Sequence, residues 1–264
     1  MRLAGKITTI IVAMAVILLG NTSLAEDDDT MGITWVILIQ NSEYAAFDNI
    51  DGPANDVSLI KGALSKYQID KIIDKQNLSK KQLLAFFTTE LKSLINTHKI
   101  KSLLIWYAGH GAISGQASYW IPTDAKKGTV ETYISSAELA SAMQPYINLL
   151  QHTLIITEAC KADSKFYTRA PEPMVIRRCT DGYGLGKRSA QSLSFSGYDK
   201  ALENSRFTAM LAEMLSTSSA ECIPIEKLVV DLTEEVFFKN RQIPNFGPIQ
   251  GFDDQKGTFF FMKK

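Results

Sequence analysis

Apolar and polar positions alternate along the chain in blocks whose periods distinguish strands from helices. Three continuous apolar runs have the length of buried strands, and one mixed stretch is also predicted to be a strand. In chain order, these strands are residues 33–40, 69–74, 102–107 and 153–157. The segments between them carry apolar residues at helical spacing, so the alternation predicts a parallel sheet with helices on both faces.

Two of the predicted helices have a recognisable start. Pro53 suits a first helical position, and Asp51 just before it is a candidate cap. Ser79, followed three residues later by Gln82, forms a capping box that opens a helix with a long apolar stripe. A further helix is predicted at residues 135–143.

Residues 163–188 interrupt the pattern, because they are rich in Arg, Lys, Pro and Gly and show no periodicity. A loop of this length usually has a function or is disordered. Regular structure is predicted again beyond it. The expected elements are a strand at 192–196, helices at 207–215 and 225–238, and a last strand at 258–262.

The first 25 residues have the layout of a secretory signal peptide. A short positive start precedes the apolar run Ile7–Leu19, which is shorter than the ~20 residues of a membrane-spanning helix. Small residues for cleavage follow in Ser23-Leu24-Ala25. We expect export to the periplasm or the medium, a disordered acidic tail at 26–32 and one domain at 33–264. An uncleaved membrane anchor is the alternative; the cleaved form would have no stable membrane association.

The chain has 264 residues, with 28 basic and 28 acidic side chains, and this balance gives no electrostatic reason to expect a nucleic acid partner. Neither the three cysteines nor the three histidines have the spacing of a zinc site, and no EF-hand loop is present. We therefore expect no metal and no cofactor. In an oxidising compartment Cys179 and Cys222 can pair and leave Cys160 free, although two buried unpaired thiols fit the sequence equally well.

Two predicted strands end in reactive side chains. The third runs into His110, which lies between Gly109 and Gly111, and the fourth runs into Cys160. Parallel sheets bind ligands beyond the carboxyl ends of their strands, so neighbouring strands would bring the imidazole and the thiol together. An imidazole can take the proton of a thiol nucleophile and return it to the leaving amine.

The backbone around these residues also suggests chemistry. The flanking glycines predict an exposed, tightly turned loop, and the N–H groups of Gly111 and Cys160 are candidate donors to an oxyanion. Each residue alone has a simpler interpretation, because a lone Cys often fills a core position and a lone His in a glycine-rich turn is often structural.

These motifs resemble those of the caspase-like cysteine peptidases, which include caspases, metacaspases and their bacterial relatives. The matching stretches are ILIQNSEY, GPANDVSLI, YAGHG, YWIPTDA, EAC, NSRFTAML and QIPNFG with GTFFF. His110 and Cys160 are 50 residues apart, close to the separation typical of caspases. The EAC motif is similar to that of legumains as well, so legumain-like specificity stays open.

The resemblance covers residues 33–264 and implies an α/β fold. It implies a caspase-like three-layer sandwich, with a mostly parallel central sheet of about six strands and helices on both faces. It also implies a Cys-His dyad and an oxyanion hole. The expected parts are a large-subunit-like part at 33–162, a linker loop at 163–190 and a small-subunit-like part at 191–264.

The residue two positions before Cys160 bears on specificity. Caspases have a Gln there and bind a P1 Asp with arginines, whereas this chain has Glu158 and no Arg in residues 48–56. Metacaspase-like enzymes have an acidic residue at that position, so the resemblance implies cleavage after Arg or Lys. Asp48 is a second candidate for substrate binding. A capping or salt-bridging role, with Lys161 as partner, is the alternative for Glu158.

The resemblance thus implies a cysteine endopeptidase that acts on polypeptides. The alternative is a caspase-fold binding or regulatory module without activity, because fold alone does not establish function. Some metacaspase-like enzymes need calcium, which nothing in the sequence indicates, and the oligomeric state is open. If cleavage follows basic residues, Arg177-Arg178 and Lys187-Arg188 make the 163–188 loop a candidate site of self-processing; a simple connector is the alternative.

Overall fold

The computed structural model describes residues 31–115, 117–160, 174–195, 206–240 and 244–264. The predicted signal peptide and nearly all of the acidic tail lie outside the described residues, and so does the first part of the 163–188 loop. The side chains of Cys160 and of residues 236–240 are likewise outside the described part. No helix within the described ranges is both long enough and apolar enough to cross a bilayer.

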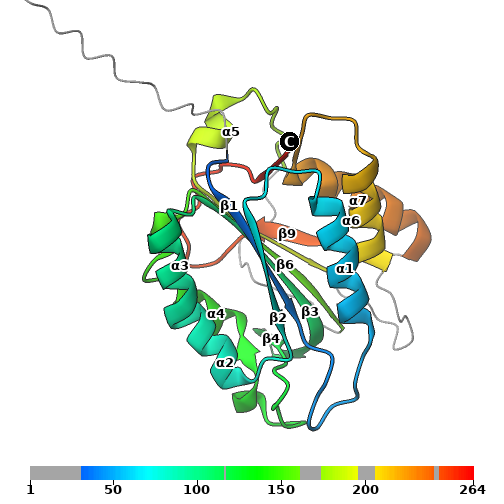
Figure 1. The fold of residues 1–264 in the computed structure, drawn as a ribbon. Helices are drawn as coiled ribbons and strands as arrows, with labels where there is room; N and C mark the ends of the chain where they lie inside the picture. The colour runs from blue at the N-terminus through cyan, green and yellow to red at the C-terminus, as the bar shows by residue number, and fades with distance from the viewer. Residues whose placement is uncertain (1–30, 116, 161–173, 196–205, 241–243) are drawn as a thin grey trace, which may run out of the picture.

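Six strands follow one another across the central sheet in the order β2-β1-β3-β6-β7-β9 (Figure 1). They are β2 (Lys71–Gln76), β1 (Thr34–Gln40), β3 (Ser102–Ser114), β6 (His152–Cys160), β7 (Ser189–Phe195) and β9 (Asn245–Pro248). The first five run parallel, and β9 is antiparallel to β7. The predicted α/β fold with a mostly parallel sheet is therefore confirmed.

The strand next to β7 at the edge of the sheet was not predicted from the sequence. The expected last strand is β10 (Phe260–Met262), which pairs with β8 (Cys222–Pro224) in a separate two-stranded sheet. The place beside β7 belongs to β9, whose sequence NFGP has little strand propensity. Its backbone is held extended by pairing with residues 191–194 of β7.

Two layers of helices enclose the sheet (Figure 1). One contains α1 (Gly52–Leu64), α6 (Arg206–Thr217) and α7 (Ile225–Asn240), and the other contains α2 (Lys80–Ala85), α3 (Leu91–His98) and α4 (Ser136–Met143). Alternate residues of β1 belong to two different cores: Val36 packs in the cluster that includes α1, and Ile37 in the one that includes α3. Burial on both faces explains the continuous apolar runs of these strands.

The helix starts follow their local signals with one exception. Ser79 Oγ accepts a hydrogen bond from the N–H of Gln82, and Gln82 Oε1 accepts one from the N–H of Ser79, which confirms the capping box. Pro53 lies in the first turn of α1. Asp51 occupies the N-cap position, but its side chain makes no capping hydrogen bond, so the predicted cap is wrong. A π-helical turn (Phe86–Glu90) separates α2 from α3.

Strand β3 is much longer than the predicted strand at 102–107. It continues through Gly109 and His110 to Ser114 and then pairs with β4 (Ala117–Trp120), which in turn pairs with β5 (Ile134–Ser135). His110 therefore lies in an extended strand, and the expected tightly turned loop is wrong. An ideal Cβ built on Gly109 would lie 2.7 Å from Tyr44 Oη and 2.9 Å from Tyr107 Oη. Glycine is needed here for close packing.

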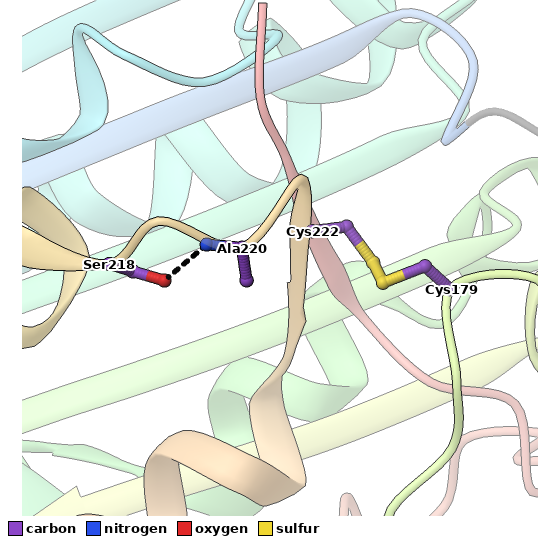
Figure 2. The surroundings of a disulfide bond; sticks show 4 residues. All are labelled: Cys179, Ser218, Ala220 and Cys222. Atoms are coloured by element: carbon purple, nitrogen blue, oxygen red, sulfur yellow. Dashed lines mark hydrogen bonds between the residues drawn. A yellow bond between two sulfur atoms is a disulfide. The ribbon is translucent and has the colours of Figure 1, made fainter.

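A disulfide bond joins Cys179 to Cys222, with 6.0 Å between their Cα atoms (Figure 2). Cys222 is buried at the start of β8, whereas Cys179 belongs to the segment that precedes α5 (Gly182–Gly186). Of the two states that the sequence left open for these cysteines, the structure has the disulfide. Cys160 is then the one cysteine of the chain outside it.

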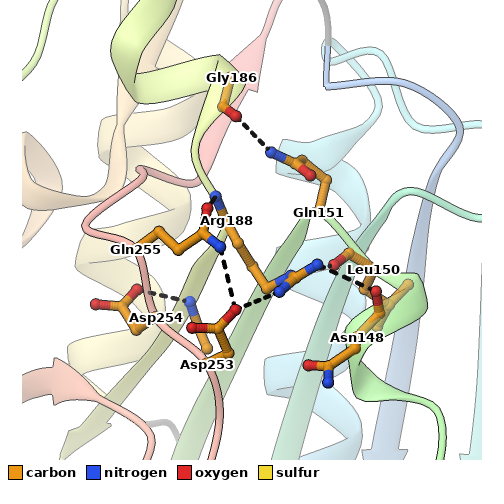
Figure 3. Close-up of polar contacts among 9 residues, drawn as sticks. Asn148, Leu150, Gln151, Gly186, Arg188, Asp253, Asp254 and Gln255 are labelled. Carbon is orange, nitrogen blue, oxygen red and sulfur yellow. Dashed lines mark hydrogen bonds and ion pairs between the residues drawn. The ribbon is translucent and has the colours of Figure 1, made fainter.

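The end of the 163–188 loop, which has no periodic pattern in the sequence, is firmly packed. Arg188 donates to the carbonyls of Leu150 (3.2 Å) and Asn148 (3.2 Å) and forms an ion pair with Asp253 (Figure 3). Its own carbonyl accepts hydrogen bonds from the N–H groups of Gln255 and Gly257. These contacts join the start of β7 to the loop that precedes β10.

The buried His152, at the amino end of β6, is hydrogen-bonded to α5 and to the start of β7. Its Nε2 lies 3.0 Å from the Leu185 carbonyl and its Nδ1 lies 2.9 Å from Ser189 Oγ. The carbonyl can only accept, so Nε2 carries the proton and Nδ1 accepts from the hydroxyl. Burial lowers the pKa of His152 from 6.5 to about 4, against the opposing effect of the Leu185 hydrogen bond.

Candidate active site

Strands β3 and β6 are neighbours, and their register pairs the Cα of His110 with that of Cys160 at the last position of the ladder. Both residues come directly after the buried parts of two parallel strands, so both lie at the carboxyl edge of the sheet, where such folds bind ligands. The structure therefore brings together the two positions that the sequence singled out. The side chain of Cys160 lies outside the described part.

A backbone carbonyl orients the imidazole of His110. Its Nε2 lies 2.8 Å from the carbonyl oxygen of Asp48, in the loop after β1. Because a carbonyl oxygen only accepts hydrogen bonds, Nε2 must carry the proton, and the neutral ring then has its lone pair on Nδ1. The ring is thus held as the tautomer whose Nδ1 can accept a proton.

Aromatic rings pack against the imidazole. The ring centroid of Tyr44 lies 4.6 Å from that of His110, and the centroid of Phe47 lies 5.7 Å away. Tyr44 Oη also accepts a hydrogen bond of 2.8 Å from the N–H of His110 and donates one of 2.9 Å to the Asn41 carbonyl. These contacts restrict both the backbone and the ring of His110.

The carbonyl of His110 has two donors, the N–H of Ile121 at 3.0 Å and Tyr107 Oη at 2.9 Å. Burial, with smaller effects from Tyr44, raises the pKa of Tyr107 well above 10.0, so this hydroxyl keeps its proton and remains a donor. The backbone of His110 is thus bonded to groups on the β1 and β4 side of the strand.

Successive residues of an extended strand direct their backbone groups to opposite sides. Since the N–H and carbonyl of His110 face β1 and β4, the N–H of Gly111 faces β6. Gly111 lies opposite Trp120 of β4, but the N–H of Gly111 points away from β4. It is directed towards β6, at the edge that contains Cys160.

The two predicted substrate-binding carboxylates differ in their surroundings. Glu158 is half-buried and lies in register between Ala108 of β3 and Phe195 of β7. It therefore occupies the middle of the carboxyl edge of the sheet. The Asp48 side chain is 92% exposed, and its carboxylate lies 3.7 Å from Lys127 Nζ. It is the backbone of Asp48 that reaches the site, and no side-chain pattern could have indicated this.

Tyr44, whose ring packs against His110, also lines a hollow of about 890 Å³. Its acidic lining residues are Glu43, Asp51 and Asp124. Within the described ranges, no group of three or more His, Cys, Asp or Glu side chains is arranged to bind a metal ion.

The caspase-domain family model matches residues 33–248 of the chain. No curated protein matches the chain significantly. The matched region is most of the described fold and contains both rim positions, His110 and Cys160. The chain therefore belongs to the caspase-domain family of caspase-like cysteine peptidases.

Proposed function

We propose that the protein is a cysteine endopeptidase in which Cys160 is the nucleophile and His110 its general base. The observation that carries this proposal is the register, which pairs the two residues across neighbouring strands at the carboxyl edge of the sheet. The proton on Nε2 of His110, held by the Asp48 carbonyl, supports the assignment because it leaves Nδ1 for the thiol.

The reaction then follows the ordinary course of acyl transfer. The Cys160 thiol gives its proton to His110 Nδ1, and the sulfur attacks the carbonyl carbon of the scissile bond. The N–H groups of Gly111 and Cys160 donate to the oxyanion, and the imidazolium returns the proton to the leaving amine. A water molecule, deprotonated by His110, hydrolyses the thioester and regenerates the enzyme. The Asp48 carbonyl stabilises the imidazolium through its Nε2–H.

Glu158 is the proposed determinant of P1 specificity. It lies two residues before Cys160 in β6, and a half-buried carboxylate there favours Arg or Lys and repels Asp. Lys161, the competing salt-bridge partner considered for Glu158, lies outside the described residues.

We further propose export through residues 1–25. The disulfide between Cys179 and Cys222 supports this, because such bonds persist mainly in oxidising compartments. Sequencing of the amino terminus of exported material tests the proposal. A mature chain that begins at Glu26 is expected, and a retained residue 1 would contradict it.

Fluorogenic peptides with Arg, Lys, Asp or Asn at P1, assayed with the parent and with Cys160→Ala, test the activity. We expect turnover after Arg or Lys by the parent and none by Cys160→Ala. Cleavage after Asp would overturn the role of Glu158, and cleavage after Asn would favour legumain-like specificity. Absence of turnover with all four peptides and with protein substrates would favour a binding module.

A further inference from the structure

Lys80, the first residue of α2, has its ammonium group enclosed by three oxygen atoms. Its Nζ donates to the carbonyls of Tyr133 (2.6 Å) and Glu131 (2.9 Å) and forms an ion pair of 3.1 Å with Glu138 Oε2. The side chain is only 23% exposed. One ammonium group thus satisfies two backbone carbonyls and one carboxylate, which would lack these donors without it.

The backbone of Lys80 is bonded to the same region. Its N–H donates to Asp124 Oδ1 at 2.8 Å, and the adjacent Thr123 accepts a hydrogen bond of 2.9 Å from the N–H of Ala45. Residues 121–133 therefore form a platform, held by α2 on one side and bonded to the loop after β1 on the other.

That platform supports the imidazole of His110. The Tyr133 ring is buried and lies edge-on to Phe47, with 6.1 Å between the ring centroids. Phe47 in turn packs on His110 and directly precedes Asp48, whose carbonyl holds Nε2. A contiguous path of packed rings and hydrogen bonds therefore leads from the Lys80 ammonium to the proposed base.

We propose that Lys80 is a positioning residue for His110. The proposal rests on the function assigned to the Cys160–His110 pair. The ammonium of Lys80 fixes Tyr133, Tyr133 fixes Phe47, and Phe47 with the Asp48 carbonyl keeps the imidazole in the orientation that presents Nδ1. Because misplacement of a catalytic group by about 1 Å can cost ~10²-fold in rate, loss of this support has a measurable effect on turnover.

The chain offers a matched control. Lys75 has the same side-chain exposure, 23%, and an ion pair of 2.7 Å with Glu90, but it lies on β2 outside the platform. We expect Lys80→Met to lower kcat about 10- to 100-fold with KM within about twofold of the parent. Lys75→Met should leave both constants unchanged.

Alkylation of Cys160 by iodoacetamide as a function of pH gives a reading independent of substrate. With Cys179 and Cys222 in the disulfide, Cys160 is the sole thiol. In the parent, His110 should keep alkylation fast well below the ordinary thiol pKa of about 8.5, whereas His110→Ala should follow the ordinary thiol. Lys80→Met should shift towards His110→Ala, and Lys75→Met should match the parent.

The outcomes separate the two proposals. Identical profiles for the parent and His110→Ala would overturn the dyad, and the positioning role with it. Different profiles for those two, with Lys80→Met equal to the parent, would overturn the positioning role alone, as would an equal shift in Lys75→Met. If Lys80→Met does not fold, Phe47→Leu removes the ring between Tyr133 and His110 at a partly exposed position and must show the same shift.

Discussion

The carbonyl oxygen of Asp48 lies 2.8 Å from Nε2 of His110. A backbone carbonyl thus orients the imidazole, a role that a carboxylate side chain has in many hydrolases. The Asp48 carboxylate itself points into solvent. The same residue was a candidate for substrate binding from the sequence, and the two roles predict opposite results on mutation.

We expect Asp48→Ala to keep kcat/KM within about threefold of the parent, because the carbonyl remains and an exposed ion pair contributes little. His110→Ala should lose all measurable activity. Steady-state kinetics on the best basic P1 peptide provide the comparison. A loss of more than about thirtyfold in Asp48→Ala would show that the carboxylate takes part after all.

Gly109→Ala should lower both stability and turnover. Its new methyl group would lie 2.7 Å from Tyr44 Oη and 2.9 Å from Tyr107 Oη, the hydroxyls that hold the backbone of His110. Overpacking of this kind costs about 1–3 kcal/mol, and displacement of the two tyrosines should reduce kcat/KM at least tenfold.

Gly62→Ala is the control for that substitution, because nothing lies within 4 Å of its added Cβ in α1. Alanine in a helix should raise stability by about 0.5–1 kcal/mol and leave activity unchanged. Thermal unfolding of both variants checks the contrast. Equal stability of Gly109→Ala and the parent would contradict the close packing of the two tyrosine hydroxyls against Gly109.

His152 should make the protein less stable in mild acid. The folded state lowers its pKa to about 4, whereas the unfolded chain binds the proton near 6.5. The stabilisation is therefore complete above about pH 6.5 and is lost as the pH falls towards 4, by an amount on the order of 3 kcal/mol. Urea unfolding at pH 7 and pH 4.5 should show a steeper decline for the parent than for His152→Gln. Equal declines would contradict the prediction.

The disulfide closes 43 residues, and the chain-entropy relation gives about 4 kcal/mol of stabilisation for a loop of that size. We expect reduction, or Cys179→Ala with Cys222→Ala, to lower the free energy of unfolding by up to this amount. Activity should persist in the folded variant, because neither cysteine lies at the rim. Urea unfolding with and without reductant measures the difference, and unchanged stability would contradict the prediction.

Of the two basic pairs in the 163–188 loop, only one is presented for cleavage. Arg178 is exposed, whereas the Lys187 carbonyl is packed against Gly257, and Arg188 is bonded through its guanidinium and its carbonyl (Figure 3). If the enzyme processes itself within the described part of this loop, the cut should follow Arg177 or Arg178. Mass spectrometry of the fragments identifies the bond.

Replacement of both Arg177 and Arg178 by Gln should abolish that cut, and Lys187→Gln should not. The Cys160→Ala protein is the control and should stay intact. A fragment beginning at Arg188 or Ser189 would contradict the prediction, since those peptide groups are engaged in the folded protein.

The sequence predicted the central features of this fold because burial on both faces leaves continuous apolar runs, as in β1. It also placed His110 and Cys160 at one edge, since each follows such a run. The edge strand β9 was missed because NFGP becomes extended only through pairing with β7. The Asp48 carbonyl was missed for a different reason: every residue has one, so composition and spacing contain no trace of its use.

The glycines around His110 show how a correct signal can receive the wrong physical explanation. Gly109 suggested a turn, yet the residue is needed because two tyrosine hydroxyls occupy the space of a side chain. In the same way, Asp51 precedes a helix as a cap should, but its side chain makes no capping bond. The local sequence pattern thus singled out Gly109 and Asp51 correctly as special positions, but it could not show the contacts that each makes in the folded protein.

Because β6 and β7 are neighbours in the sheet, cleavage of the chain between them should not separate the two pieces. Both halves would contribute adjacent strands to one sheet, and β6 would lose a full ladder of hydrogen bonds if they separated. After a cut that follows Arg177 or Arg178, both cysteines of the disulfide belong to the carboxyl-terminal piece, so no covalent bond would join the two pieces. A nicked molecule should therefore migrate as one particle under native conditions and as two polypeptides in denaturant, even without reductant.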